Sequence, residues 1–473
     1  MIANTKNNWR VGLVLILVTF IVVKSQDLNI PYFWDELGVY APGSLKMKDS
    51  GQIGILPINL DPEYSRGHPL LCFFFHALTF KFFGDTVLVA HATSLFTGCC
   101  ILIAGFLFIR SVFSEKAALL YVFLMALQPF FYAMSGIIAP ENLLTLFSIL
   151  SVWAIVKRKW LLYAIAGSLA ILTKESAIVI PATALLFLLI QSIKERRLFT
   201  WGRMAAFFAA GTPILVFIAF LLVQKAQNGW YFFPLHVNLM QFGMHDINYK
   251  LNRMFATIFL DQGRWLICIP GILYIICEAI VPSPRKETRD AILAIVLFLV
   301  LSEGFASINF YLDRYTLYAL PFAIMLGAQA FVIFAGLFNK KSVRLILPLL
   351  FCGYAVFAGV KNMDPKEFHD SIDMAYKHTV YVVADGIHWG EKQPWAYEFI
   401  DASFPVFQAL DDKRNGYISR KSWPHSANVG EGNARYGIYF HLENQEPYMP
   451  PKQYNIIKRF DREYAHILIV EYK

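Results

Sequence analysis

Long apolar runs separated by short polar loops are the dominant pattern of this chain. One run lies near the N-terminus and ten more lie between residues 87 and 360. They predict a mostly α-helical, polytopic membrane protein with roughly eleven spans, some of them shorter than the ~20 residues of a typical membrane-crossing helix. The predicted spans are Val11–Val23, Val87–Phe108, Ala117–Ile138, Leu143–Val156, Trp160–Leu172, Ala177–Ile193, Met204–Val223, Trp265–Val281, Ala291–Phe310, Tyr315–Phe338 and Leu345–Val360.

Two apolar stretches have a second interpretation. Val11–Val23 follows Lys6 and Arg10 and is short, so a cleaved signal peptide is the alternative to a first membrane helix. No small-residue cleavage site of the A-x-A type follows it, and we therefore expect a membrane helix. The stretch from Leu70 to Phe83 is interrupted by His76 and Lys81, which predicts a helix lying along the membrane interface.

Two segments are polar enough to lie outside the membrane. Residues 24–69 form a first loop rich in proline and glycine, and residues 361–473 form a tail without a span-length apolar run. Within the tail, four short stretches rich in β-branched and aromatic residues predict strands. We expect residues 1–360 to be the membrane domain and residues 361–473 a small extracytoplasmic α/β domain, with the last two strands forming a hairpin. The stretches are Val380–Ala384, Tyr436–Phe440, Tyr454–Phe460 and Ala465–Tyr472.

Composition agrees with the hydrophobic pattern. Hydrophobic residues make up 57% of the 473 residues, charged residues 16%, and mean hydropathy is +0.48. A soluble protein cannot bury so much apolar surface. The net charge of +8 does not indicate nucleic-acid binding, because the basic residues are spread over short loops between the spans. The six cysteines fall in apolar stretches, without the spacing of a disulfide framework or a metal site.

The loop charges predict the orientation of the chain. With the N-terminus in the cytoplasm, the basic clusters between the spans all fall on the cytoplasmic side, as the positive-inside rule requires. The acids and the isolated cations then share the extracytoplasmic face, and we expect a common site there. The basic clusters are Arg110 and Lys116; Lys157, Arg158 and Lys159; Lys194, Arg196, Arg197 and Arg203; Arg285, Lys286 and Arg289; and Lys340, Lys341 and Arg344.

An acidic pair opens the first outer loop, in the sequence Phe-Trp-Asp-Glu-Leu-Gly-Val-Tyr at residues 33–40. Asp35 is the candidate catalytic base, because a carboxylate at the membrane surface can accept the proton of an attacking hydroxyl. Glu36 would point about 100° away on a helical turn, so the two acids cannot serve one proton. The alternative is a structural helix start, with Asp35 as N-cap and Glu36 as a first-turn acid.

Two outer-face cations are candidate phosphate ligands. Lys174 lies at the extracytoplasmic end of a span, against the cytoplasmic bias that most lysines follow, and Arg314, next to Tyr315, precedes another span. Together they could neutralise a phosphate or pyrophosphate leaving group. The alternatives are local pairing of Lys174 with Glu175, snorkelling, or a salt bridge between Arg314 and Asp313.

The other candidate site residues carry weaker signals. The candidates for substrate binding are Glu36, His68, Glu141, Lys174, Glu175, His236, Arg314 and Tyr315. Glu141 follows Pro140 and could be only a first-turn acid of a helix. His68 precedes Pro69 and either binds the acceptor or supports the Asp35 loop. His236 lies in an aromatic outer loop that is first of all a membrane-interface segment, and is a candidate for the mouth of the site, as are His245 and Asp246.

Taken together, these motifs resemble the GT-C membrane glycosyltransferases, in the branch of protein O-mannosyltransferases and aminoarabinose transferases. The motifs are the Asp-Glu pair, Gly-His-Pro-Leu at residues 67–70, Pro-Glu at 140–141, Leu-Thr-Lys-Glu at 172–175 and Arg-Tyr at 314–315. The resemblance covers most of residues 1–360. The family commonly has a second proline after His-Pro, where this chain has Leu70.

The resemblance implies an enzyme that takes a sugar from a polyprenyl-phosphate donor and transfers it outside the cytoplasm. Asp35 matches the family's base, and Lys174 and Arg314 match positions associated with the lipid phosphate. We expect inversion at the anomeric carbon, a hydroxyl-bearing acceptor of unknown identity, and a bacterial or archaeal cytoplasmic membrane. The chemistry requires no cofactor, although some relatives bind a divalent metal. The competing hypotheses are a transporter or flippase, for which the sequence lacks related halves, and a non-catalytic assembly scaffold.

Overall fold

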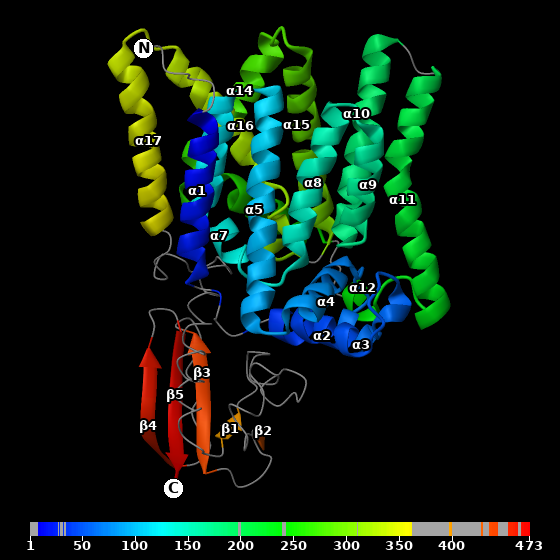
Figure 1. Cartoon of the computed structure of the whole chain (residues 1–473), viewed down its shortest axis with the longest axis vertical. Helices are drawn as coiled ribbons and strands as arrows, with labels where there is room; N and C mark the ends of the chain where they lie inside the picture. Colours follow the sequence, from blue (N-terminus) through cyan, green and yellow to red (C-terminus); the bar gives the residue numbers. More distant parts are fainter. Residues whose placement is uncertain are drawn as a thin grey trace.

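The computed structural model of this chain is a helical bundle with a small β-sheet beyond one end (Figure 1). It describes residues 8–26, 28, 32, 35–196, 200–238, 243–309, 311–361, 397–399, 427–428, 435–442, 453–461 and 465–473. The helices of the bundle are α1 (Asn8–Ser25), α5 (Val87–Val112), α6 (Glu115–Ala126), α7 (Pro129–Met134), α8 (Pro140–Val156), α9 (Trp160–Ile171), α10 (Val179–Glu195), α11 (Trp201–Asn228), α13 (Met244–Phe255), α14 (Trp265–Ile280), α15 (Lys286–Ile308), α16 (Leu320–Gly336) and α17 (Lys341–Lys361).

Four short helices gather at one end of the bundle, the end beyond which the sheet lies (Figure 1). The last turn of α10 and the first turn of α11 lie at the opposite end. The helices at the sheet end come from the predicted first loop, from the predicted interfacial stretch and from the aromatic loop after α11. They are α2 (Ala41–Asp49), α3 (Pro62–Ser65), α4 (Leu71–Phe83) and α12 (Pro234–Asn238).

Each predicted span is covered by helix, which confirms a mostly helical membrane protein with several apolar spans. By length and composition, four described helical segments can cross a membrane unaided: α5, the continuous segment Glu175–Glu195, α11 and α15. A bent pair, Met244–Leu260 with Trp265–Ile280, adds a fifth if it counts as one span. The remaining predicted spans correspond to other helices, several of them only 12 to 17 residues long.

Proline explains where one predicted span differs from the structure. Ala117–Ile138 forms two helices, α6 and α7, which are separated at Gln128. Pro129 restricts Gln128 to an extended backbone, with ψ of 117°, so the helix stops and a new one starts. Pro140 begins α8 in the same way, three residues before the predicted start.

The sheet has the strand order β2-β1-β3-β5-β4. Strands β3 (Tyr436–Leu442), β4 (Tyr454–Asp461) and β5 (Ala465–Tyr472) confirm three of the predicted strands, and β4 pairs antiparallel with β5 as the predicted hairpin. β5 lies between β3 and β4, and its Ile469 and Val470 are fully buried. The short strands β1 (Tyr397–Phe399) and β2 (Ala427–Asn428) complete the sheet, while residues 380–384 lie outside the described residues. The division into domains at residue 360 stays a prediction.

Candidate active site

In the first outer loop, helical structure begins at the acidic pair. Asp35 precedes η2 (Glu36–Tyr40), a five-residue π-helical turn that continues into α2. The Asp35 side chain makes no capping hydrogen bond, so the alternative role of a helix N-cap is not supported. With 28% of the side chain exposed, the carboxylate remains open to a reactant.

Asp35 forms an ion pair with Arg314, a residue 279 positions away in the sequence. Arg314 lies in η7 (Asp313–Thr316), just before α16, and its side chain is buried. Its neighbour Asp313 faces a different partner: Arg253 of α13 donates from Nε at 3.1 Å and from Nη2 at 2.5 Å. Arg314 is therefore not engaged by Asp313, the local salt bridge that the sequence left open.

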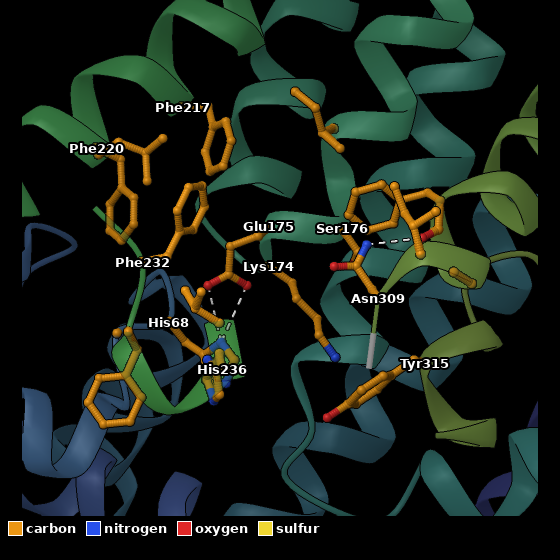
Figure 2. Close-up of a pocket in the computed structure, with 18 of the residues that line it drawn as sticks. His68, Lys174, Glu175, Ser176, Phe217, Phe220, Phe232, His236, Asn309 and Tyr315 are labelled. Carbon is orange, nitrogen blue, oxygen red and sulfur yellow. Dashed lines mark hydrogen bonds and ion pairs between the residues drawn. The ribbon is translucent and has the colours of Figure 1, made fainter. Parts of the chain in front are cut away.

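Lys174 occupies a buried position between an acid and an aromatic ring. Its ammonium donates to Glu141 Oε1 at 2.5 Å and lies 3.4 Å from the centroid of the Tyr315 ring. Figure 2 shows Lys174 extending toward Tyr315 and away from Glu175. The extended backbone of Lys174, with φ of −159° and ψ of 144°, sends adjacent side chains to opposite sides.

Glu175 pairs instead with His68, whose Nδ1 lies 3.2 and 3.3 Å from the two carboxylate oxygens. The His68 ring lies 4.7 Å from the His236 ring, measured between centroids, so these two outer-loop histidines meet as expected (Figure 2). Burial, and then the neighbouring His68, lower the pKa of His236 to about 4. His236 is therefore neutral near pH 7.

A pocket of about 410 Å³ adjoins these groups. Its apolar wall comes from α11 and α15, with Phe217, Phe220 and Phe305 among the lining residues. Its polar wall holds the groups drawn in Figure 2: His68, Lys174, Glu175, His236 and Tyr315. Asp35 and Arg314 do not line it, but the guanidinium carbon of Arg314 lies 5.3 Å from the centroid of the Tyr315 ring, so the Asp35–Arg314 pair lies beside this lining residue.

Glu36 is placed differently from the other candidates. Its side chain is 1% exposed, and Oε1 accepts a hydrogen bond from the backbone N–H of Ile138 at 2.7 Å. The same oxygen lies 2.9 Å from His91 Nε2. Of the weaker candidates, His245 is almost fully exposed and faces Asp246 at 3.9 Å, outside the pocket lining.

Three further residues lie in this region that the sequence pattern did not indicate as site candidates. Tyr40 is buried at the end of η2, where burial and then the negative charges of Glu141 and Asp35 raise the pKa of its hydroxyl. Its spacing from Asp35 on a helical turn was the available signal. His91 lies inside an apolar span, and Arg253 lies in a segment predicted to be a loop, so neither stood out from its neighbours. Among the described residues, no group of three His, Cys, Asp or Glu is arranged to hold a metal ion.

Comparison with known structures identifies the architecture. The chain has the fold of the GT-C membrane glycosyltransferases, as the sequence motifs predicted. The crystal structure of ArnT from Cupriavidus metallidurans bound to undecaprenyl phosphate matches with a TM-score of 0.57 and 13% identity, covering 98% of each chain. The apo form of the same protein matches with a TM-score of 0.56 and 13% identity over 97% of each chain. The archaeal oligosaccharyltransferase AglB from Archaeoglobus fulgidus, in complex with an inhibitory peptide and a dolichol-phosphate, matches with a TM-score of 0.53 and 11% identity, covering 92% of this chain and 69% of AglB.

Sequence comparison agrees with the fold. Residues 67–228 match the family model of dolichyl-phosphate-mannose-protein mannosyltransferases, which is about a third of the chain. That range contains His68, Glu141, Lys174 and Glu175. A search of curated proteins found no significant match. The chain is thus an integral membrane protein with a glycosyltransferase fold.

Proposed function

We propose that this protein is a membrane glycosyltransferase that moves a sugar from a polyprenyl-phosphate donor to a hydroxyl group of its acceptor. The observation that carries the proposal is the pocket, which is apolar along α11 and α15 and ends at Lys174 and Tyr315, beside the Asp35–Arg314 pair. A prenyl phosphate has the same two-part character, an apolar chain and an anionic head. The undecaprenyl phosphate in ArnT and the dolichol-phosphate in AglB support this class of donor.

In the proposed donor complex, the prenyl chain lies against the phenylalanines of the pocket and the phosphate faces Lys174. The ammonium exchanges part of its contact with Glu141 for phosphate oxygens, while the Tyr315 ring keeps its position over the cation. Arg314 supports the same headgroup. One nitrogen, Nη2, bonds Asp35, and Nε has no hydrogen-bond partner among the described residues, so the guanidinium is not saturated.

In the proposed reaction, Asp35 takes the proton of the acceptor hydroxyl as its oxygen attacks the anomeric carbon. The new carbon–oxygen bond forms on the face opposite the phosphate, the bond to the phosphate oxygen breaks, and the configuration inverts. Lys174 and Arg314 stabilise the negative charge that grows on the departing phosphate. Asp35 has access for this role, because 28% of its side chain is exposed, against 1% for the neighbouring acids Glu36 and Glu141.

We place the reaction on the extracytoplasmic side. The proposal rests on the positive-inside distribution of the loop charges, since the proposed site residues lie in the segments that this rule assigns to the outer face. The small sheet beyond the same end of the bundle would then also be extracytoplasmic (Figure 1).

The test is Asp35→Asn, assayed with a panel of polyprenyl-phosphate sugars in reconstituted membranes. Removing a general base lowers the transfer rate by roughly 10²- to 10⁴-fold, whereas donor binding should persist. Asp49→Asn is the matched control, because Asp49 ends α2 in the same outer region and is exposed. Transfer by the Asp35 variant at the wild-type rate would refute the base assignment. Wild-type protein that moves lipid-linked sugars across liposome membranes without transferring them would favour the flippase hypothesis.

A further inference from the structure

A buried cluster lies directly behind the candidate base. Glu36, the residue after Asp35, points away from the pocket toward His91 on α5. The side chains of Glu36 and His91 are only 1% and 2% exposed. Tyr32 packs against the edge of the imidazole, with ring centroids 5.6 Å apart and an interplanar angle of 77°. The cluster therefore joins the first outer loop, α5 and the segment between α7 and α8, where Ile138 donates to Glu36.

The hydrogen bonds of this cluster determine where its protons lie. His91 Nδ1 is 3.0 Å from the carbonyl oxygen of Leu28, which can only accept, so Nδ1 carries a hydrogen. His91 Nε2 lies 2.9 Å from Glu36 Oε1, which already accepts the N–H of Ile138. One further proton must lie between Nε2 and the carboxylate. A proton held between Nε2 and the carboxyl group satisfies all three contacts, and charge-assisted hydrogen bonds of this kind are the strong ones.

We propose that His91 and Glu36 are positioning residues that hold Asp35 in place for the transfer reaction. Asp35 adjoins η2, a π-helical turn, and such turns are less stable than α-helix and frequent at functional sites. The anchored Glu36 side chain fixes the first residue of that turn, and the Arg314 ion pair fixes the Asp35 side chain. The inference rests on the proposed function, and it makes Glu36 a structural partner of the base.

The test uses His91→Ala and Glu36→Ala in the same transfer assay. Misplacing a catalytic group by about 1 Å can cost 100-fold, so each variant should lower kcat by roughly 10- to 100-fold. The KM for the donor should stay near the wild-type value, because neither side chain lines the pocket. If the two residues act as one unit, the double variant should lose no more activity than either single variant. Wild-type kcat in His91→Ala, or losses that multiply in the double variant, would overturn the proposal.

Glu36→Gln separates positioning from acid–base chemistry. In this variant the amide oxygen can take the place of Oε1 and accept from both the backbone N–H of Ile138 and the Nε2–H of His91, so the contacts that anchor the turn persist. The variant should therefore keep most of the activity, in contrast to Asp35→Asn. If Glu36→Gln is as inactive as Asp35→Asn, Glu36 takes part in the chemistry and the proposal fails.

His76→Ala controls for the loss of a buried imidazole. His76 lies on the neighbouring α4, with Nδ1 3.1 Å from the carbonyl oxygen of Cys72 in its own helix and Nε2 3.5 Å from Ser94 Oγ on α5. This variant should melt at a lower temperature but keep the wild-type kcat. If His76→Ala lowers kcat as much as His91→Ala does, the loss reflects general destabilisation, and a specific role of His91 is refuted.

A measurement without catalysis keeps this inference separate from the proposed function. In protein labelled with ¹⁵N in its histidine rings, NMR should show a ring Nδ1–H signal that is protected from exchange with water and that vanishes in His91→Ala. Its absence in the wild type would refute the proton assignment. If that signal is present but the wild type consumes no polyprenyl-phosphate sugar, the proposed function is refuted, while the hydrogen bond between His91 and Glu36 is retained.

Discussion

The Lys174 ammonium contacts two groups at once, a buried carboxylate and the face of an aromatic ring. Glu141 lies 2.5 Å from the ammonium, and the Tyr315 centroid lies 3.4 Å from it. Both partners stabilise the cation in a site with little water. These contacts place the ammonium at the end of the apolar pocket, where the proposed donor phosphate would lie.

Replacing Lys174 by Gln should weaken donor use by roughly 10- to 100-fold in kcat/KM, because hydrogen bonds between charged groups contribute about 1.5–3 kcal/mol each. The substitution also leaves Glu141 buried without its cation, which is destabilising in itself. The informative comparison is Glu141→Gln alone against Glu141→Gln with Lys174→Gln, since these two proteins differ only in the lysine. Equal donor kinetics in these two variants would contradict a phosphate role.

His236 gives the protein an acid-sensitive point. Its pKa is lowered to about 4, whereas an unfolded histidine has a pKa near 6.5. Between these values the unfolded chain binds more protons than the folded one, so stability falls as pH falls from about 6.5 to 4. Allowing for the partial exposure of the ring, His236 should lower the free energy of unfolding of the wild type by about 1 kcal/mol at pH 5. We expect His236→Gln to abolish this pH-dependent decrease. Melting temperatures of both proteins in detergent at pH 7 and pH 5 check this, and an equal drop in both would contradict it.

Three pairs of adjacent charged residues separate in the folded chain. Asp35 pairs with Arg314 while Glu36 meets His91. The same happens at 174–175 and at 313–314, where each residue has a distant partner of its own. The residue types at the site could be predicted from the sequence, because charges are conspicuous in an apolar chain. Their partners could not, since pairings across 33 to 279 residues depend on how the helices pack.

At the scale of elements, helices α14 and α16 approach each other through glycine. A Cβ at Gly327 would lie 2.2 Å from the backbone oxygen of Ile267, and one at Gly271 would lie 2.9 Å from the backbone nitrogen of Gly327. Backbone atoms cannot move aside as a flexible side chain can. Small residues at such crossings let helices in a membrane pack closely, which compensates for the missing hydrophobic drive between them.

Gly327→Ala should therefore destabilise the protein by about 1–3 kcal/mol, the usual cost of overpacking. Gly304→Ala is its control within α15, because a Cβ there meets no heavy atom within 4 Å among the described residues. It should be neutral or stabilising by up to about 1 kcal/mol, since alanine is the better helix former. Thermal unfolding in detergent measures both. A Gly327 variant as stable as the Gly304 variant would show that the close crossing is absent.

For the whole molecule, the distribution of basic loops predicts which end faces the cytoplasm. Gln52 lies in the first outer loop and Lys116 at the start of α6, and both are exposed. On a cysteine-free background, Gln52→Cys should react with a membrane-impermeant thiol reagent in intact cells. Lys116→Cys should react only after the membrane is opened. The reverse pattern would invert the orientation and move the proposed site to the cytoplasmic face.

The sequence by itself determined the helical membrane class, the approximate spans, three strands of the tail and the residue types of the site. Hydropathy, proline and loop charge are local properties, so they can be read without knowing the packing. The tertiary structure alone decided that residues 35, 141, 174 and 314 meet beside one apolar pocket, and that Glu36 turns away to His91. The physical reason is that a buried charge takes the partner that helix packing brings within hydrogen-bond distance, whatever its separation along the chain.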